Sequence, residues 1–552
     1  MNALALLPRW SDWKPALRSP GADLLSGLIV ALVALPLALG FGISSGLGAA
    51  AGLATAVVAG AIAAVFGGSR FQVSGPTGAM TVVLVPIVGR HGASGVLAVG
   101  LLAGIVLVVL AFAGVGRAVR YIPAPVIEGF TAGIAVVIAL QQFPSALHVA
   151  HAEGEKVWQS AFDAVGQYIA HPHPLTPATT LVVAAVVLAG GRYLPKLPFA
   201  LIAVAAATVA AQVFDLDVTP IGTIPSGLPA PTLGFVHFDQ LGTLIAPALA
   251  VAALAALESL LSATAADAMA VGTRHDSDRE LLGQGVANIA APLFGGVPAT
   301  GAIARTAVNV RSGGRTRLAA LTHAGVLAAT IYLAAPLVAE IPLAALAGVL
   351  LATTVRMVET ASLAAIARAS RGDAIIMAIT FGVTVALDLV TAVAVGVAIA
   401  TVLALRSVAK EARLRQVPLE HPGDDTGHLA EENELLHDRI VAYRIDGPLF
   451  FAAAHRFLLE LADVSDVHVV ILRMSGITAL DTTGALVLKD AIGKLEHRHI
   501  TVLMSGLRQD HRRRLAAIGA LPAGGDAHIF AHTPEAIDHA RGYAQSPAGH
   551  TM

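Results

Sequence analysis

The sequence predicts a polytopic α-helical membrane protein that ends in a small soluble α/β domain. The chain has 552 residues, of which 56% are hydrophobic and only 13% are charged. Apolar residues concentrate between positions 23 and 405, and strand and helix patterns alternate beyond position 440. A short glycine-containing motif occurs twice in the apolar part. A soluble protein of this length could not bury so much apolar surface.

Composition narrows the classes of function. Cys is absent, which excludes disulfides, thiolate metal sites and thiol chemistry. The formal net charge is −2, so nucleic acid is not an expected partner, and no cofactor is expected. Residues 1–22 contain Trp10 and Asp12 and predict a cytoplasmic, interfacial segment before the first span, with no evident signal peptide.

Fourteen segments are predicted within the membrane, several of them too short to cross its ~30 Å core as regular helices. They cover residues 23–43, 48–67, 75–88, 94–115, 124–142, 178–190, 198–213, 245–268, 282–293, 301–311, 318–336, 341–355, 373–387 and 389–405. Arginine and lysine gather in the loops after the even-numbered segments, whereas the long loops 143–177 and 214–244 contain only Lys156. By the positive-inside rule, both chain termini are expected in the cytoplasm.

The glycine-containing motif indicates an inverted repeat. SGPTGAM at residues 74–80 resembles VPATGAI at residues 297–303, and Thr77 and Thr300 are 223 positions apart. The same offset aligns the first predicted segment with the eighth. The motif and this pair of segments therefore align in a single register. Seven segments separate the copies, and an odd number reverses the orientation of the second copy. The sequence therefore predicts a 7+7 inverted repeat.

Each copy of the motif is predicted to form one half of an anion-binding site. Pro76, Gly78, Pro298 and Gly301 disfavour a continuous helix and favour an extended piece that starts a half-helix in the middle of the membrane. Two facing half-helix N-termini offer N–H groups and partial positive charge to an anion. Arg305, one turn further on, adds a full charge; a snorkelling or loop-facing arginine is the alternative.

Glu258 lies deep in the eighth segment between long uncharged stretches. A carboxylate in such a place usually faces a cavity and is functional, and Ser262 shares its helical face. Glu258 is expected to bind a coupling proton, because burial disfavours the charged form of a carboxyl group. Na⁺, a pair with Arg305 and a structural hydrogen bond to another span are the alternatives. Asp267, nearer the cytoplasmic end, is expected to be solvated.

The pattern changes beyond position 405. Residues 406–439 are polar and predict a linker, residues 440–545 a domain and residues 546–552 a tail. Within the domain, residues 440–454 predict a strand pair, 457–462 a helix, 466–474 a buried strand, 482–496 a helix and 499–505 a strand. This alternation is typical of an α/β fold.

Several of these stretches together resemble the SulP family of sulfate permeases and anion exchangers. They are FQVSGPTGAM (71–80), LESLLSATAADAM (257–269) and the long run from RHDSDRELLGQG to RTRLA (274–319). GPLFFAAA and ALDTTG in the C-terminal part resemble the STAS domain of that family. The resemblance implies a uracil-permease-like 7+7 fold, usually as homodimers. Spans 1–4 and 8–11 would form a core, spans 5–7 and 12–14 a gate, and substrate would lie between the half-helices of spans 3 and 10.

The resemblance also assigns residues to the site. Glu258 matches an acidic residue that is Asp in sodium-coupled bicarbonate members and Glu in members regarded as proton-coupled, and Ser262 matches the following hydroxyl. Ala302, Ile303 and Ala304 stand where many animal members have serines, so backbone N–H groups are expected as the main ligands. The expected substrate-binding residues are Phe41, Pro76, Thr77, Gly78, Ala79, Thr300, Gly301, Ala302, Ile303, Ala304 and Arg305. Thr483 falls where related antagonists of anti-sigma factors carry a phosphorylated serine; an unmodified helix N-cap is the preferred alternative.

The predicted function is secondary active transport of a small anion across a bacterial cytoplasmic membrane, not enzymatic catalysis. It would be proton-coupled and use an elevator-like movement of core against gate. The chain most resembles bacterial C4-dicarboxylate uptake members, and sulfate and bicarbonate stay open as substrates. A sodium-coupled bicarbonate transporter and a passive anion channel or exchanger are the alternatives. Expected partners are the anion, the coupling ion, the bilayer, a second copy of the chain and a cytoplasmic partner of the STAS domain.

Overall fold

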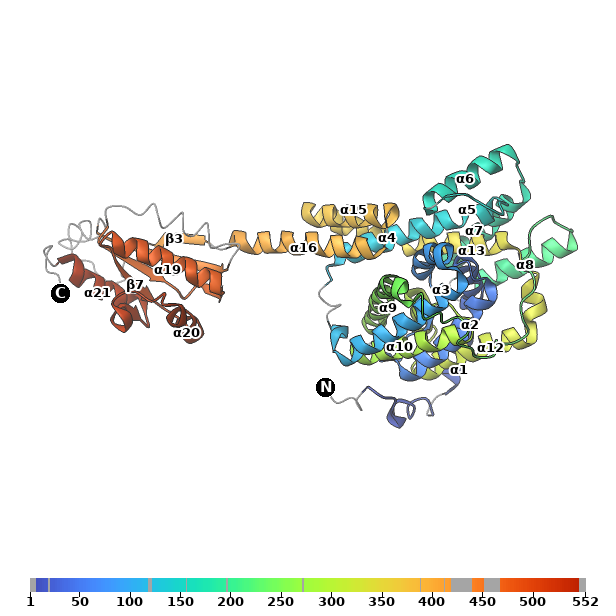
Figure 1. Cartoon of the computed structure of the whole chain (residues 1–552), viewed down its shortest axis with the longest axis horizontal. Coiled ribbons are helices and arrows are strands. Elements are labelled where there is room, and N and C mark those ends of the chain that lie inside the picture. The colour runs from blue at the N-terminus through green and yellow to red at the C-terminus, as the bar shows by residue number, and fades with distance from the viewer. Residues whose placement is uncertain are drawn as a thin grey trace. The chain divides into compact units, whose positions relative to one another are not determined.

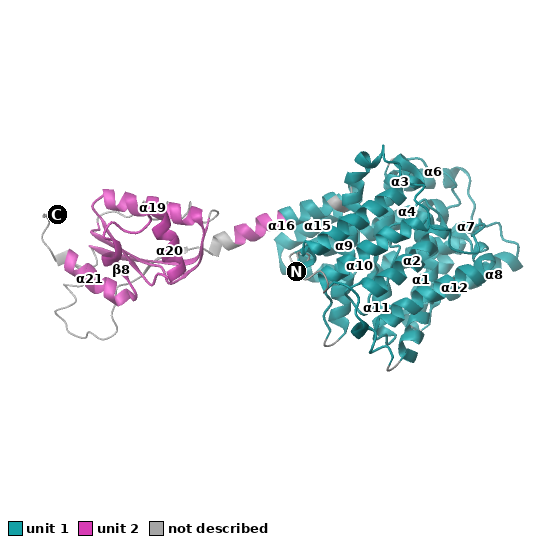
Figure 2. Ribbon diagram, turned by 60° about the horizontal axis from the view of Figure 1, so that its bottom comes forward, with its two compact units in different colours: residues 1–398 teal, residues 399–552 magenta. Residues whose placement is uncertain are grey.

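The computed structural model describes residues 6–17, 20–117, 122–154, 156–194, 197–270, 273–387, 389–411, 413–417, 439–450 and 467–545. The chain divides into two compact units, residues 1–398 and 399–552 (Figure 2). In its described residues, the first unit is built of helices and two short strands, and the second contains a six-stranded sheet (Figure 1).

Two groups of helices make up the first unit. The core group comprises α1 (Pro20–Ser44), α2 (Ala49–Phe66), α3 (Gly78–Phe112), α9 (Leu241–Met269), α10 (Ser277–Leu293), α11 (Ile303–Arg311) and α12 (Arg317–Ala339). The gate group comprises α4 (Ala124–Gln141), α5 (Phe143–Ala146), α6 (Val157–Ala170), α7 (Leu175–Tyr193), α8 (Phe199–Val213), α13 (Leu343–Met357), α14 (Thr360–Ala369), α15 (Arg371–Ala386) and α16 (Leu389–Glu411). The most extensive packing within the core group joins α3 to α10, α1 to α12, α2 to α10 and α3 to α9, and within the gate group it joins α4 to α15 and α7 to α13.

The predicted membrane segments coincide with helices or with parts of them. The third and fourth segments share one element, α3, whose helical backbone is interrupted at Gly92 (φ 66°). Within the described residues, eight helices are long and apolar enough to cross a membrane. Among the described residues of the first unit, the helices α5, α6 and α14 lie outside the predicted segments.

The two motifs form two-residue strands at the centre of the core group. β1 (Ser74–Gly75) and β2 (Thr300–Gly301) pair antiparallel, with Ser74 opposite Gly301 and Gly75 opposite Thr300. Each strand runs into a helix, α3 at Gly78 and α11 at Ile303. The sequence correctly predicted extended pieces that begin helices. We call residues 71–77 the first leader and residues 297–302 the second leader.

The N-terminal segment is attached to the core group. It contains the 3-10 turn η2 (Trp10–Asp12), and Asp12 forms a 2.7 Å ion pair with Arg279 of α10. Burial of Asp12 opposes its ionisation, but the hydrogen bonds from Arg279 and the Arg9 N–H, together with the charges of Arg279 and Arg317, outweigh this effect and lower the pKa of Asp12. Trp10 remains exposed, as expected of an interfacial residue.

The second unit is an α/β domain. β4 (Ile440–Leu449) pairs antiparallel with β3 (Arg413–Val417) and parallel with β5 (Val469–Arg473) and β6 (Ile477–Leu480). β7 (Thr501–Ser505) lies between β5 and β8 (Ile529–Phe530), parallel to both. The helical elements are α19 (Thr482–His497), α20 (Gln509–Ile518), η4 (Gly525–His528) and α21 (Thr533–Gln545). The strand residues contribute to two separate apolar clusters, one with α19 and one with α21, which explains the continuous apolar run of β5.

In four respects this region differs from what the sequence predicts or lies outside the described residues. The segment expected as a linker supplies β3, which pairs with β4 at the edge of the sheet. Residues 440–449 form one strand, and the helix expected at residues 457–462 lies outside the described residues. Thr483 is not an N-cap: Asp481 caps α19 by accepting from the Gly484 N–H over 2.7 Å, and Thr483 is exposed in the first turn.

Candidate functional site

The two leaders meet at Glu258. Thr77 is the N-cap of α3, Thr300 lies in β2, and the hydroxyl of each donates to the same oxygen, Oε2, of Glu258, over 2.8 and 2.7 Å. These threonines are the two residues that the repeat aligns. Glu258 is half-buried in α9. A single carboxylate therefore joins the starts of both half-helices.

Arg305 links the second half-helix to the first leader. Its side chain is 2% exposed, and Nη2 donates to the carbonyl of Pro76 over 2.6 Å. Nη1 lies beside Gly75, where an added Cβ would be 2.5 Å from it, and has no hydrogen-bond partner among the described residues. A snorkelling or loop-facing arginine is therefore excluded, and the cation lies buried under the two leaders.

The backbone donors at the site fall into two sets. Gly301 donates its N–H to Ser259 Oγ (2.9 Å), and Ala302 donates to the carbonyl of Val73 (3.0 Å). Both N–H groups are therefore satisfied by hydrogen bonds within the protein, and the prediction that they bind the anion is wrong. Extended backbone inside a membrane needs such hydrogen-bond acceptors, because lipid supplies none. First-turn N–H groups have no acceptor one turn back in their own helix. In the candidate site they belong to Gly78, Ala79, Ile303, Ala304 and Arg305, and the Met80 N–H is excluded because Thr77 caps it.

The two half-helix starts differ in accessibility. Residues 76–79 are all buried, whereas Ile303 and Ala304 are exposed at the start of α11. Phe41 of α1 and Ile138 of α4 close over Gly78, because an added Cβ there would lie 3.1 Å from Phe41 Cε1 and 2.1 Å from Ile138 Cδ1. The gate group thus touches the start of α3 directly.

Ser262 does not contact Glu258 by a hydrogen bond. It is fully buried and donates to Thr306 Oγ1 over 3.1 Å, and Thr306 accepts from the N–H of Val73 over 3.1 Å. Ser262 therefore supports the first leader from α9. Thr306 of α11 was not predicted as a site residue, and it bonds to both Ser262 and the first leader.

α10 carries a polar face that was not predicted from the sequence. Glu280 is 1% exposed and accepts hydrogen bonds from the N–H groups of Gly68 and Ser69 and from Gln72 Nε2, over 2.6–3.0 Å. Gln284 and Asn288 follow at intervals of four. Polar residues repeated at this interval in an apolar segment are the signal that would have revealed the face.

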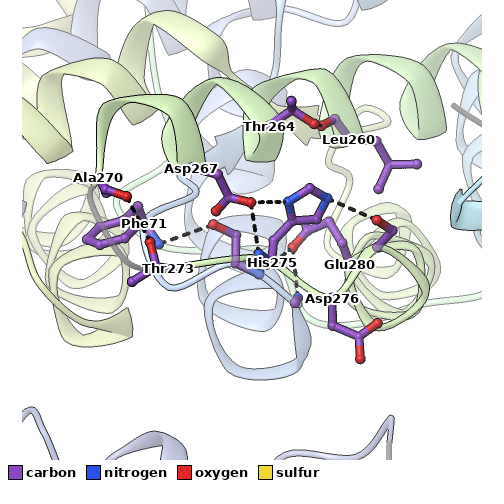
Figure 3. A network of polar contacts seen from close by, with 12 residues as sticks. Phe71, Leu260, Thr264, Asp267, Ala270, Thr273, His275, Asp276 and Glu280 are labelled. Atoms are coloured by element: carbon purple, nitrogen blue, oxygen red, sulfur yellow. Dashed lines mark hydrogen bonds and ion pairs between the residues drawn. The ribbon is translucent and has the colours of Figure 1, made fainter. Parts of the chain in front are cut away.

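The C-terminal end of α9 is held by a contact between Asp267 and His275. Figure 3 shows Asp267 turned toward His275, whose ring Nδ1 and backbone N–H both contact Asp267 Oδ2, over 2.7 and 2.9 Å. The Asp267 side chain is 19% exposed, so the expectation of a solvated residue is wrong. The carboxylate fixes the short loop between α9 and α10.

A cavity of about 590 Å³ lies between the core and gate groups. Residues of α3, α4 and α13 line it, including Val82, Gln141 and Leu346. Thr81, one turn beyond Thr77, donates to Gln141 Oε1 over 3.2 Å. Glu258 and Arg305 are not among the lining residues, so this cavity is separate from the candidate anion site.

Comparison with known proteins places this geometry in a family. Residues 21–380 match the sulfate permease family and residues 435–536 match the STAS domain. The chain is 34% identical to YvdB of Bacillus subtilis, whose name assigns it to sulfate transport, over 93% of this chain and 96% of the relative. It is 30% identical to the bicarbonate transporter BicA of Synechocystis, over 95% and 94%.

Solved structures agree with the fold. The transmembrane domain of a cyanobacterial BicA matches with a TM-score of 0.62 and 33% identity, over 70% of this chain and 98% of that one. The murine anion transporter Slc26a9 in its inward-facing state matches with a TM-score of 0.83 over 98% and 94%, at 17% identity. The chain belongs to the sulfate permease family and carries a C-terminal STAS domain.

Proposed function

We propose that this protein is a secondary active transporter that binds a small anion between the starts of α3 and α11 and carries the coupling proton on Glu258. One observation supports the proposal above all: Thr77 and Thr300 donate to the same oxygen of Glu258. Because this carboxylate is bonded to both half-helices, a change in its protonation acts on both sides of the anion site. The protein works as a homodimer in a bacterial cytoplasmic membrane, with both chain termini in the cytoplasm. Transport proceeds by an elevator-like movement of the core group against the gate group.

Electrostatics gives the sign of the coupling. An anion at ~5–8 Å from an ionised Glu258 is repelled by roughly 2–3 kcal/mol per unit charge at an effective dielectric constant of ~20. A proton on Glu258 removes this repulsion, and anion and proton then strengthen each other's binding by the same factor. Anion affinity should therefore fall as pH rises.

The substrate is proposed from the relatives and from the site. Sulfate and bicarbonate are the anions in the relatives' names, and both are small oxyanions that suit backbone N–H donors. The C4-dicarboxylates suggested by the sequence are larger and belong in the same assay as a third class.

Uptake by the purified protein in proteoliposomes tests the proposal. Labelled sulfate, bicarbonate and fumarate are supplied with an inward proton gradient, with and without an opposing sodium gradient. Glu258→Gln should still exchange anions but lose proton-driven accumulation and the pH dependence of affinity. Glu128→Gln is the matched control, because Glu128 accepts from Ser362 within the gate group and should leave coupling unchanged.

Two results would change the assignment. Undiminished proton-driven accumulation by Glu258→Gln would remove Glu258 from the coupling mechanism. Accumulation by the wild type that follows sodium alone would assign the same carboxylate to Na⁺. The observation that favours this second candidate is the convergence of three oxygens, from Glu258, Thr77 and Thr300, since oxygen ligands suit hard cations.

A further inference from the structure

α10 presents two buried carboxamides to the two leaders. Gln284 and Asn288 are both 0% exposed and lie four residues apart, so they share one face of the helix. A carboxamide buried in this way is stable only with hydrogen-bond partners. The partners of these two side chains identify what the face does.

Asn288 acts on the second leader. Its Oδ1 accepts from the N–H of Ala299 over 2.8 Å, and its Nδ2 donates to the carbonyl of Ala299 over 2.9 Å. One side chain thus satisfies both backbone groups of a residue, as a neighbouring β-strand would. Ala299 directly precedes Thr300, which donates to Glu258. The Asn288 amide therefore fixes the backbone that aims the Thr300 hydroxyl.

Gln284 acts on the first leader. Its Nε2 donates to Ser74 Oγ over 2.7 Å and to Glu280 Oε1 over 2.9 Å. Ser74 is the residue that pairs with Gly301 in the two-stranded ladder. Asn288 also donates to the backbone carbonyl of Gln284 over 2.8 Å, so the two amides are linked to each other.

We infer that Asn288 and Gln284 are positioning residues of the anion site, which set the two leaders so that Thr77 and Thr300 reach one oxygen of Glu258. This inference rests on the proposed function, because it concerns the residues that couple anion to proton. Neither amide touches Glu258 by a hydrogen bond, and both act through backbone or hydroxyl groups of the leaders. Their effect should therefore appear in the coupling as well as in stability.

The test measures sulfate binding by the full-length protein across a range of pH, together with its unfolding temperature. Asn288→Leu keeps the size of the side chain and removes its hydrogen bonds; Asn288→Ser keeps a hydroxyl that can serve one group of Ala299. Gln284→Leu tests the other leader. Thr264→Val is the control, because the Thr264 hydroxyl bonds only to the carbonyl of Leu260 in its own helix.

We expect Asn288→Leu to weaken sulfate binding at least tenfold and to flatten its pH dependence. The sulfate affinity of Asn288→Ser should lie between those of Asn288→Leu and the wild type. Thr264→Val should bind sulfate as the wild type does. If the leucine variants do not fold, the sulfate affinity and pH dependence of Asn288→Ser test the inference. Wild-type affinity and pH dependence in Asn288→Ser and Gln284→Leu, with only a lower unfolding temperature, would overturn the inference. A wild-type protein that binds sulfate without pH dependence would instead contradict the proposed function.

Discussion

The core and gate groups are both bundles of apolar helices, yet they use polar side chains differently. In the gate group, the hydroxyls of Thr131, Thr208 and Thr353 donate to the carbonyl four residues back in their own helix. In the core group, buried side chains such as Asn288 and Arg305 reach non-helical backbone of another segment. Lipid offers no hydrogen bonds, so side chains must supply them wherever the backbone leaves the helix. Polar residues therefore mark the place where the helices are broken.

The largest effect should come from substituting Arg305, a buried arginine of the core group; Arg356, an exposed arginine of the gate group, is the control. Arg305 donates to Pro76 O at the site, and Arg356 donates to Val187 O in the gate over 2.8 Å. Arg305→Leu should lower sulfate affinity about 100-fold, because a charge-assisted hydrogen bond and the buried cation are lost together. Arg356→Leu should change it less than about twofold. Isothermal titration of both variants measures the difference, and equal affinities would make Arg305 a structural residue.

A side chain at Gly78 should have the next largest effect. Gly78→Leu would meet Ile138 and Phe41, so we expect uptake in proteoliposomes to fall at least tenfold. Gly382→Leu in the gate group is the control, since nothing lies within 4 Å of an added Cβ there. Normal uptake by Gly78→Leu would contradict the close approach at the start of α3.

The equivalent change in the second leader is a weaker test. A Cβ on Gly301 would lie 2.2 Å from Gln72 Nε2. Gly301→Leu should therefore disturb packing against Gln72, and a loss of uptake would not report on how closely an anion approaches the backbone.

Removal of the STAS domain should affect the site less. The cut belongs after Glu411, because a cut just before residue 440, where the sequence places the start of the domain, would leave β3 without its partner β4. The truncated protein should bind sulfate within about twofold of the wild type, since all candidate ligands precede the cut, while expression or turnover falls. Loss of equilibrium binding in a well-folded truncation would show that the domain shapes the site.

The smallest effects should separate two threonines. Thr353→Val removes a hydroxyl that bonds only within α13 and should change the free energy of unfolding by less than about 0.5 kcal/mol. Thr306→Val leaves the N–H of Val73 without its acceptor and should cost about 1–3 kcal/mol. Thermal unfolding of both variants measures the contrast. Equal shifts would mean that the polar contacts of the core group carry no special weight.

The sequence predicted helices and half-helices well, because hydrophobic runs, prolines and glycines act locally. It could not predict which N–H groups stay available, because Gly301 and Ala302 lose theirs to Ser259 and Val73, which lie on segments distant in sequence. The cap of α19 was misassigned for a different reason. Asp481 and Thr483 are both residue types that cap helices, and sequence places a helix start only to within one or two residues.

The short β1–β2 ladder has a consequence for the direction of transport. Its two strands are bonded to each other and lead directly into α3 and α11, so neither half-helix can shift alone without breaking the ladder. We expect the site to keep its internal distances whichever side of the membrane it faces. At equal pH an anion would then bind equally well from either side, and the protein would act as a reversible carrier whose net flux is decided by the gradients outside it.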